Sequence, residues 1–113
     1  MAQRPKGKEF EGHWEFPGGK VEQGETPEEA LIRELREELS IETQTACLAP
    51  VAFASHDYQN FHLLMPLFVC RKWNGMPKPV EGQALKWIRI KEITQLKMPP
   101  ADIPLAAQLR DMF

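Results

Sequence analysis

The chain has 113 residues, a formal net charge of −2 and 27% charged residues, which indicates one domain with a modest core. The nearly balanced charge gives no strong attraction to nucleic-acid polymers or to an anionic membrane surface. Since no signal peptide and no long apolar run is visible, we expect a soluble cytoplasmic protein. Cys47 and Cys70 fall on predicted strands, where we expect buried thiols rather than a disulfide.

The first fifteen residues form a basic arm that leads into a tight turn. Arg4, Lys6 and Lys8 supply the charge, and this segment is either a solvated arm or a source of cations for a phosphate tail. The run F-P-G-G then turns the chain at residues 16–19, and Gly18 allows its backbone carbonyl to approach a ligand closely.

Strong start signals predict a helix from Pro27 to Leu39. Thr26 is a suitable N-cap, and Glu29 three residues later completes a capping box. Pro27 occupies the first helical position, where its missing N–H is not needed.

This predicted helix carries an apolar arc and an acidic arc side by side. Crowded carboxylates of like charge destabilise an isolated helix by about 0.2–0.5 kcal/mol per pair, whereas a solvated face would alternate its signs. Such a face suits a hard divalent cation that prefers oxygen ligands. The apolar arc contains Leu31, Ile32, Leu35 and Leu39, and the acidic arc contains Glu34, Glu37 and Glu38.

Three strands are expected after the helix. The first covers residues 45–54, with an edge or bulge at Pro50, and a polar loop over 55–60 leads to a strongly apolar strand over 61–73. Pro66 is awkward inside that strand and also suggests a bulge or an unpaired edge.

A loop over residues 74–83 carries Glu81 and precedes the third strand, over 84–90. A short helical turn over 91–97 follows. The last helix is expected to reach Met112, with Asp102 as its N-cap.

The chain resembles the Nudix family, whose box reads G-x5-E-x7-R-E-U-x-E-E-x-G-U, with U a bulky apolar residue. Ser40 is the one departure, standing where the pattern has a glycine suited to a left-handed helix end. The resemblance implies an α/β (α+β) fold in one domain over residues 1–113, with a mixed β-sheet between helices. The matching positions are Gly19, Glu25, Arg33, Glu34, Leu35, Glu37, Glu38 and Ile41.

The runs A-Q-R-P and W-E-F-P-G-G-K further resemble the MutT branch of this family. The family places two strands before the position of Arg4, and this chain lacks them, so we expect unpaired sheet edges and exposed apolar surface. Trp14, Phe16 and Phe61 are candidates to flank a base, with core packing as the alternative. The resemblance implies substrate contacts from Arg4, Glu15, Phe16, Lys20 and Asp102.

The resemblance also implies a magnesium site, in which manganese can substitute. Arg33 is expected to orient a box carboxylate by a forked hydrogen bond, and Glu25 to orient the loop. Either Glu34 or Glu81 is the general base, and the sequence leaves both open. The implied metal ligands are Gly18, Glu34, Glu37, Glu38 and Glu81, and the implied catalytic residues are Arg33, Glu34, Glu37 and Glu81.

The implied reaction is hydrolysis of a nucleoside triphosphate to the monophosphate and pyrophosphate. By resemblance the substrate is 8-oxo-dGTP, and its removal would clean the nucleotide pool and limit mutation. Asp102 leaves the base open, because the best-known oxidised-guanine sanitiser has asparagine at the matching position. The alternatives are CTP or another modified nucleotide, a non-catalytic nucleotide-binding module, and a fragment that folds only as an oligomer. The family otherwise implies a monomer.

Overall fold

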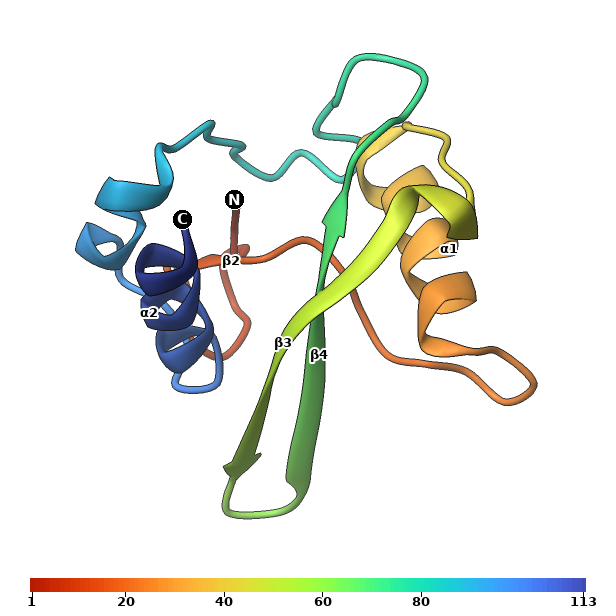
Figure 1. Cartoon of the computed structure of the whole chain (residues 1–113). Coiled ribbons are helices and arrows are strands. Elements are labelled where there is room, and N and C mark those ends of the chain that lie inside the picture. The colour runs from red at the N-terminus through yellow and green to blue at the C-terminus, as the bar shows by residue number, and fades with distance from the viewer.

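The computed structural model describes all 113 residues and has the expected α+β architecture. Its strands form two separate antiparallel pairs rather than one mixed sheet. In Figure 1 the long β3–β4 hairpin lies between α1 and α2, and its closed end extends beyond both helices. The elements are β1 (Ala2–Gln3), β2 (Trp14–Glu15), α1 (Pro27–Leu39), η1 (Thr45–Cys47), β3 (Leu48–Asp57), β4 (His62–Cys70), η2 (Ile90–Gln95) and α2 (Asp102–Met112).

Helix α1 begins and ends where the sequence predicts. The Glu29 amide donates to Thr26 Oγ1 at 3.1 Å, and the Thr26 amide donates to Glu29 Oε1 at 2.9 Å, which completes the capping box. Ser40 ends the helix in the left-handed conformation, with φ of 58° and ψ of 35°. A serine therefore occupies a backbone position that favours glycine.

The hairpin differs from the prediction at both of its ends. Residues 45–47 form the 3₁₀ turn η1, so β3 begins three residues later than expected and continues through Asp57. The closing loop is residues 58–61, and β4 ends at Cys70 rather than at residue 73. The predicted irregularity near Pro50 is confirmed by a register shift between Pro50 and Ala52.

The predicted strand over 84–90 is reduced to a single bridge, between Ala2 and Leu85. The Gln3 amide donates to the Ala84 carbonyl and the Lys86 amide to the Met1 carbonyl, both at 2.9 Å. No ladder continues beyond this short pairing, because the next residues have no strand beside them. The predicted helical turn is present as η2.

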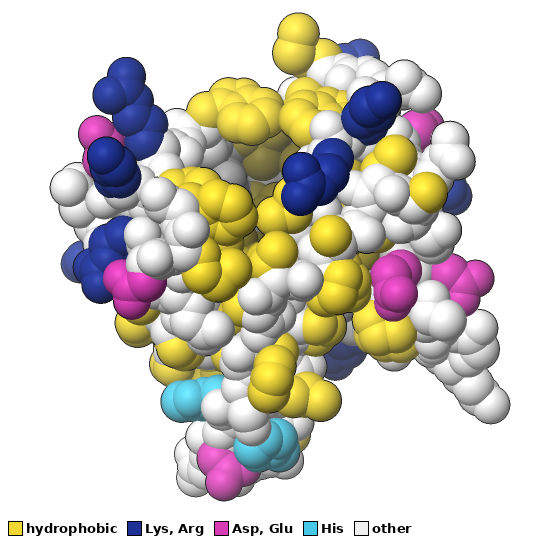
Figure 2. Space-filling model, in the orientation of Figure 1, with side chains coloured by type: hydrophobic (Ala, Val, Ile, Leu, Met, Phe, Trp, Pro, Cys, Tyr) yellow, Lys and Arg dark blue, Asp and Glu magenta, His cyan; other side chains and the backbone are white.

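The core is divided between the two helices, and only 14 of the 113 residues are buried. One cluster joins η2 to α2, and the other lies on α1. An apolar cavity of about 290 Å³ is lined by side chains from α1, by Trp73 and by Trp87. Large apolar side chains remain exposed, as the sequence predicts, with Trp87 80% exposed. Figure 2 shows hydrophobic side chains around a hollow in this face of the molecule.

Cys47 and Cys70 are free and half-buried, so no disulfide forms. Cys47 lies in the 3₁₀ turn η1 rather than on a strand. Neither helix is long and apolar enough to cross a membrane.

Candidate active site

The glycine turn lies against the acidic face of α1. A Cβ atom at Gly19 would lie 2.5 Å from the carboxyl carbon of Glu34, so a larger residue would displace that side chain. The Gly18 amide donates to Glu38 Oε2 at 3.3 Å. The turn and the acidic face therefore fix each other's position.

Arg33 orders the carboxylates around it. Its guanidinium forks onto Glu25, from Nε to Oε2 at 2.7 Å and from Nη2 to Oε1 at 3.1 Å. Nη1 also donates to Glu34 at 2.8 Å and to Glu37 at 3.3 Å. The hydrogen bonds to Glu25 and then Glu34 raise the pKa of Arg33. This is the forked arrangement expected from the sequence, with Glu25 as the partner.

Glu25 connects the helix to the preceding loop. Its Oε1 accepts from the Glu22 amide at 2.9 Å, and Arg33 Nη2 donates to the Lys20 carbonyl at 3.0 Å. The hydrogen bond from Arg33, followed by that from Glu22, lowers the pKa of Glu25. Glu25 thus holds the loop, whereas the Lys20 side chain is exposed to solvent.

Glu38 lies at the centre of a crowded negative region. Burial raises its pKa to about 7, and the charges of Glu34, Glu81 and Glu15 add to that increase. The hydrogen bond from the Gly18 amide acts in the opposite direction. Like charges therefore surround a half-buried carboxyl group, as happens where a cation belongs.

The carboxylates are not gathered into a ready metal cage. No three Asp, Glu, His or Cys side chains lie close enough to hold an ion, so the expected ligand set is not assembled. Arg33 pairs with two of the expected ligands, Glu34 and Glu37, and the Glu37 side chain is 60% exposed. The donors still fit a hard divalent cation, because all are oxygens and their mutual repulsion would be relieved by positive charge. The expected ligands were Gly18, Glu34, Glu37, Glu38 and Glu81.

The loop that carries Glu81 is attached to the end of α1. The Val80 amide and the Gln83 side-chain amide both donate to the Glu38 carbonyl, at 3.2 and 3.1 Å. The Glu81 amide donates to Gln83 Oε1 at 3.0 Å, and its carboxylate is exposed. The loop is therefore held beside the acidic face, and the Glu81 carboxylate on it is open to solvent.

Arg4 forms a second cluster of polar contacts. Its Nη1 pairs with Glu15 Oε2 at 2.9 Å, and its Nε donates to the Glu9 carbonyl at 2.7 Å. Arg4 also lines a polar cavity of about 360 Å³ together with Glu81. The structure thus brings these two predicted residues to one cavity, although Arg4 does not contact the acidic face.

Asp102 is not an N-cap, and that prediction was wrong. The cap position is Ala101, which is helical and makes no side-chain bond. Asp102 is 5% exposed, and its Oδ2 accepts from the Phe16 amide at 3.1 Å. Burial raises its pKa to about 6, opposed mainly by the Phe16 hydrogen bond, while the charge of Glu15 adds to the increase. Glu15 therefore acts electrostatically on both Asp102 and Glu38.

Tyr58 is a residue that the sequence reasoning missed. Its ring stacks on Phe61, with centroids 5.1 Å apart, and its hydroxyl accepts from the Ala101 amide at 3.3 Å. The aromatic residues at the two ends of the closing loop were the available signal. Of the three predicted base-flanking residues, Phe16 packs on the core and Trp14 lies beneath the Lys86 ammonium.

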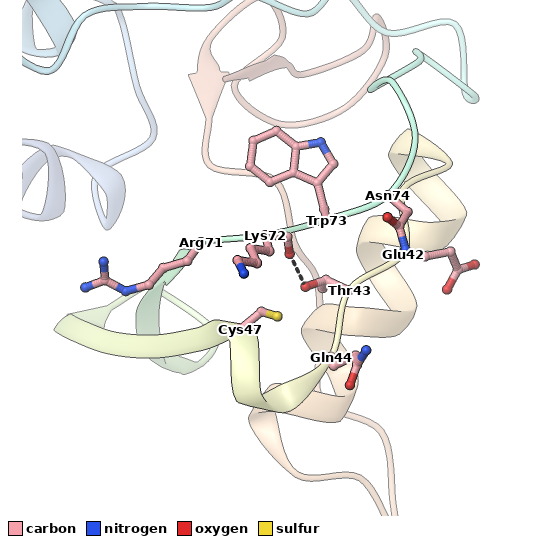
Figure 3. A pocket seen from close by; sticks show the side chains of 8 residues that line it. All are labelled: Glu42, Thr43, Gln44, Cys47, Arg71, Lys72, Trp73 and Asn74. Carbon is pink, nitrogen blue, oxygen red and sulfur yellow. Dashed lines mark hydrogen bonds between the residues drawn. The ribbon is translucent and has the colours of Figure 1, made fainter.

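The largest cavity lies elsewhere, and Figure 3 shows it from close by. It has a volume of about 720 Å³ and contains none of the predicted site residues. The candidate site is therefore assigned from the contacts of the acidic face and not from cavity size. The residues that line this cavity are Glu42, Thr43, Gln44, Cys47, Arg71, Lys72, Trp73 and Asn74.

The protein is an α+β domain in which an arginine orders the acidic face of a helix beside a glycine turn. Residues 1–109 match the NUDIX domain model. The chain therefore belongs to the Nudix hydrolase family.

Named relatives and solved structures agree with this assignment. The 8-oxo-dGTP diphosphatase of Escherichia coli K12 is 36% identical over 96 residues, covering 85% of this chain and 73% of that protein. The CTP pyrophosphohydrolase of the same organism is 40% identical over 107 residues, covering 93% and 76%. A structure from work on MutT of Aliivibrio salmonicida and Vibrio cholerae superposes with a TM-score of 0.82 at 33% identity, covering 99% of this chain and 84% of that one.

Proposed function

We propose that this chain hydrolyses nucleoside triphosphates to the monophosphate and pyrophosphate with the help of Mg²⁺, for which Mn²⁺ can substitute. The observation that carries the proposal is the arginine-ordered acidic face beside the glycine turn. Nudix hydrolases generally use divalent metal ions. The proposed substrate is a free nucleotide in the cytoplasm, acted on by a monomer.

The residues of the acidic face take distinct parts in this mechanism. Glu34, Glu37 and Glu38 would hold the ion, which neutralises phosphate charge and lowers the pKa of bound water. Arg33 keeps Glu34 and Glu37 in place, and Lys20 lies on the loop that Arg33 and Glu25 fix.

A water oxygen attacks phosphorus as the bridging bond to the leaving pyrophosphate breaks. Glu34 or Glu81 accepts the proton of the attacking water. The anchored loop allows Glu81 to approach the site, while Glu34 is already beside the glycine turn.

The leading substrate is 8-oxo-dGTP, in line with the name of the Escherichia coli relative. Asp102 and the Phe61–Tyr58 stack would meet the base, because the Tyr58 hydroxyl bonds to the residue next to Asp102. Arg4 and Glu15, which are paired, both act electrostatically on Asp102.

CTP is the second candidate. An ionised Asp102 carboxylate only accepts hydrogen bonds, and the exocyclic amino groups of cytosine and of guanine both donate, so this residue is compatible with either base. The relative named for CTP aligns over 93% of the chain.

A nucleotide panel tests both substrates. Pyrophosphate release from 8-oxo-dGTP, dGTP and CTP should require Mg²⁺, and one of these nucleotides should be preferred. Asp102→Asn should change the ranking if the carboxyl group reads the base, and an unchanged ranking removes Asp102 from that role. Nucleotide binding without pyrophosphate release would instead identify a non-catalytic binding module.

A further inference from the structure

Three polar side chains near the closed end of the β3–β4 hairpin are connected by hydrogen bonds. They take no part in the proposed nucleotide reaction. The Ser55 hydroxyl lies 2.6 Å from His62 Nε2, and His62 Nδ1 lies 2.7 Å from Asp57 Oδ1. A nucleophile, a base and a carboxylate are thus connected in series, in the order that activates a serine. In Figure 1 this end of the hairpin lies beyond both helices.

The strand geometry explains why these three side chains meet. Asp57 pairs directly with His62, and Ser55 lies two residues before Asp57 on the same face of β3. Directly opposed Cβ atoms are about 4.5–5.5 Å apart and diagonal ones about 7–8 Å, which the imidazole ring can span. The arrangement therefore follows from the hairpin register.

The hydrogen bonds also determine the imidazole tautomer. An ionised Asp57 only accepts, so His62 Nδ1 donates to it. In the neutral ring Nε2 is then the acceptor, and the Ser55 hydroxyl donates to it. His62 is thereby placed to remove the hydroxyl proton as Ser55 attacks an electrophile.

Apolar surface adjoins the serine. Leu64 pairs directly with Ser55, and Phe53 lies two residues before it on the same strand face. Phe53 is 63% and Leu64 65% exposed, so both present free apolar surface beside the hydroxyl. Figure 2 shows histidine, acidic and hydrophobic side chains at this end of the molecule.

We propose that Ser55, His62 and Asp57 form a nucleophilic site that accepts acyl groups from esters with a short apolar acyl chain. Ser55 Oγ bonds to the carbonyl carbon while its proton passes to His62 Nε2. The ester C–O bond then breaks, and the departing alkoxide takes that proton from His62. Water hydrolyses the acyl-serine by the same route and regenerates the hydroxyl.

The chain offers an internal control, because Ser40 and Ser55 are its only serines. The full chain is treated with a fluorophosphonate that phosphonylates activated serines, and peptides are mapped by mass spectrometry. Ser55 should be labelled at least about tenfold faster than Ser40. Equal labelling of the two serines, or no labelling of Ser55, would overturn the proposal.

Turnover of 4-nitrophenyl butyrate gives the second readout. Ser55→Ala and His62→Gln should each lose at least about tenfold of the nitrophenol release, and Asp57→Asn should fall in the same direction. Pyrophosphate release and the melting temperature report whether each variant still folds. Unchanged ester turnover in folded Ser55→Ala would show that the three residues only brace the hairpin.

Discussion

Replacing Asp102 with asparagine is expected to stabilise the protein at neutral pH. Asp102 is 5% exposed, and its carboxylate accepts a hydrogen bond from the Phe16 amide. Burial raises its pKa, which means that the folded state disfavours the ionised form. Asparagine retains an oxygen for the Phe16 amide but carries no charge to bury.

The size and sign of this change in stability follow from the pKa of Asp102. The folded value of about 6 lies above the ordinary value of 3.8, so the folded protein takes up a proton. The stabilisation of the folded state by the protonated Asp102 carboxyl group is fully present below pH 3.8 and is lost as the pH rises through 6. The difference between these two pKa values corresponds to at most about 3 kcal/mol of lost stability at neutral pH. A gain of about 1–3 kcal/mol in the variant would raise its melting temperature by about 4–12 °C.

Thermal melts of the wild-type chain and Asp102→Asn at about pH 4.5 and pH 7.5 provide the assay. The variant should melt higher than the wild type at the upper pH, and the difference should be clearly smaller at the lower pH, where the folded protein keeps the carboxyl group protonated. Asp111→Asn is the matched control, because Asp111 is 73% exposed and its replacement should change neither melt. A pH-independent difference between the wild type and Asp102→Asn would refute the reasoning about burial.

Three further substitutions probe the acidic face and the helix end. Glu38→Gln should reduce magnesium-dependent pyrophosphate release by at least about 100-fold, because it removes charge from the metal site. Gly19→Ala should lower the free energy of unfolding in urea by about 1 kcal/mol, because the Glu34 carboxyl group must move aside and weaken its hydrogen bond to Arg33, and by less in a Glu34→Ala background that removes the 2.5 Å clash. Ser40→Gly should raise it by about 1 kcal/mol, since φ is 58° there. If Gly19→Ala lowered the free energy of unfolding equally in the wild-type and Glu34→Ala backgrounds, the contact between Gly19 and Glu34 would be contradicted. A Ser40→Gly variant less stable than the wild type would contradict the strain at Ser40.

The sequence predicted α1 well because its signals are local. The capping box lies within four residues of the helix start, and the helix ends at Leu39 as predicted. The fork of Arg33 was also expected, since its partners lie on the same helix or the loop directly before it. Short-range spacing determines such contacts.

Long-range contacts explain the misses. The predicted strand over 84–90 needed a neighbouring strand, and only Leu85 forms a bridge. Asp102 has the residue type of an N-cap, but its carboxylate bonds to an amide 86 residues away in the sequence. The Ser55–His62 contact depends on the register of the hairpin. The sequence did not predict that register, because β3 extends to Asp57, into residues where a loop was expected.

The most direct test of the central claim is analysis of the reaction products. Incubation of 8-oxo-dGTP or CTP with the full chain and Mg²⁺, followed by chromatography, should give monophosphate and pyrophosphate in equal amounts, with none formed when the metal is chelated. Release of a diphosphate and inorganic phosphate, or unchanged hydrolysis without the metal, would contradict the account of the acidic face.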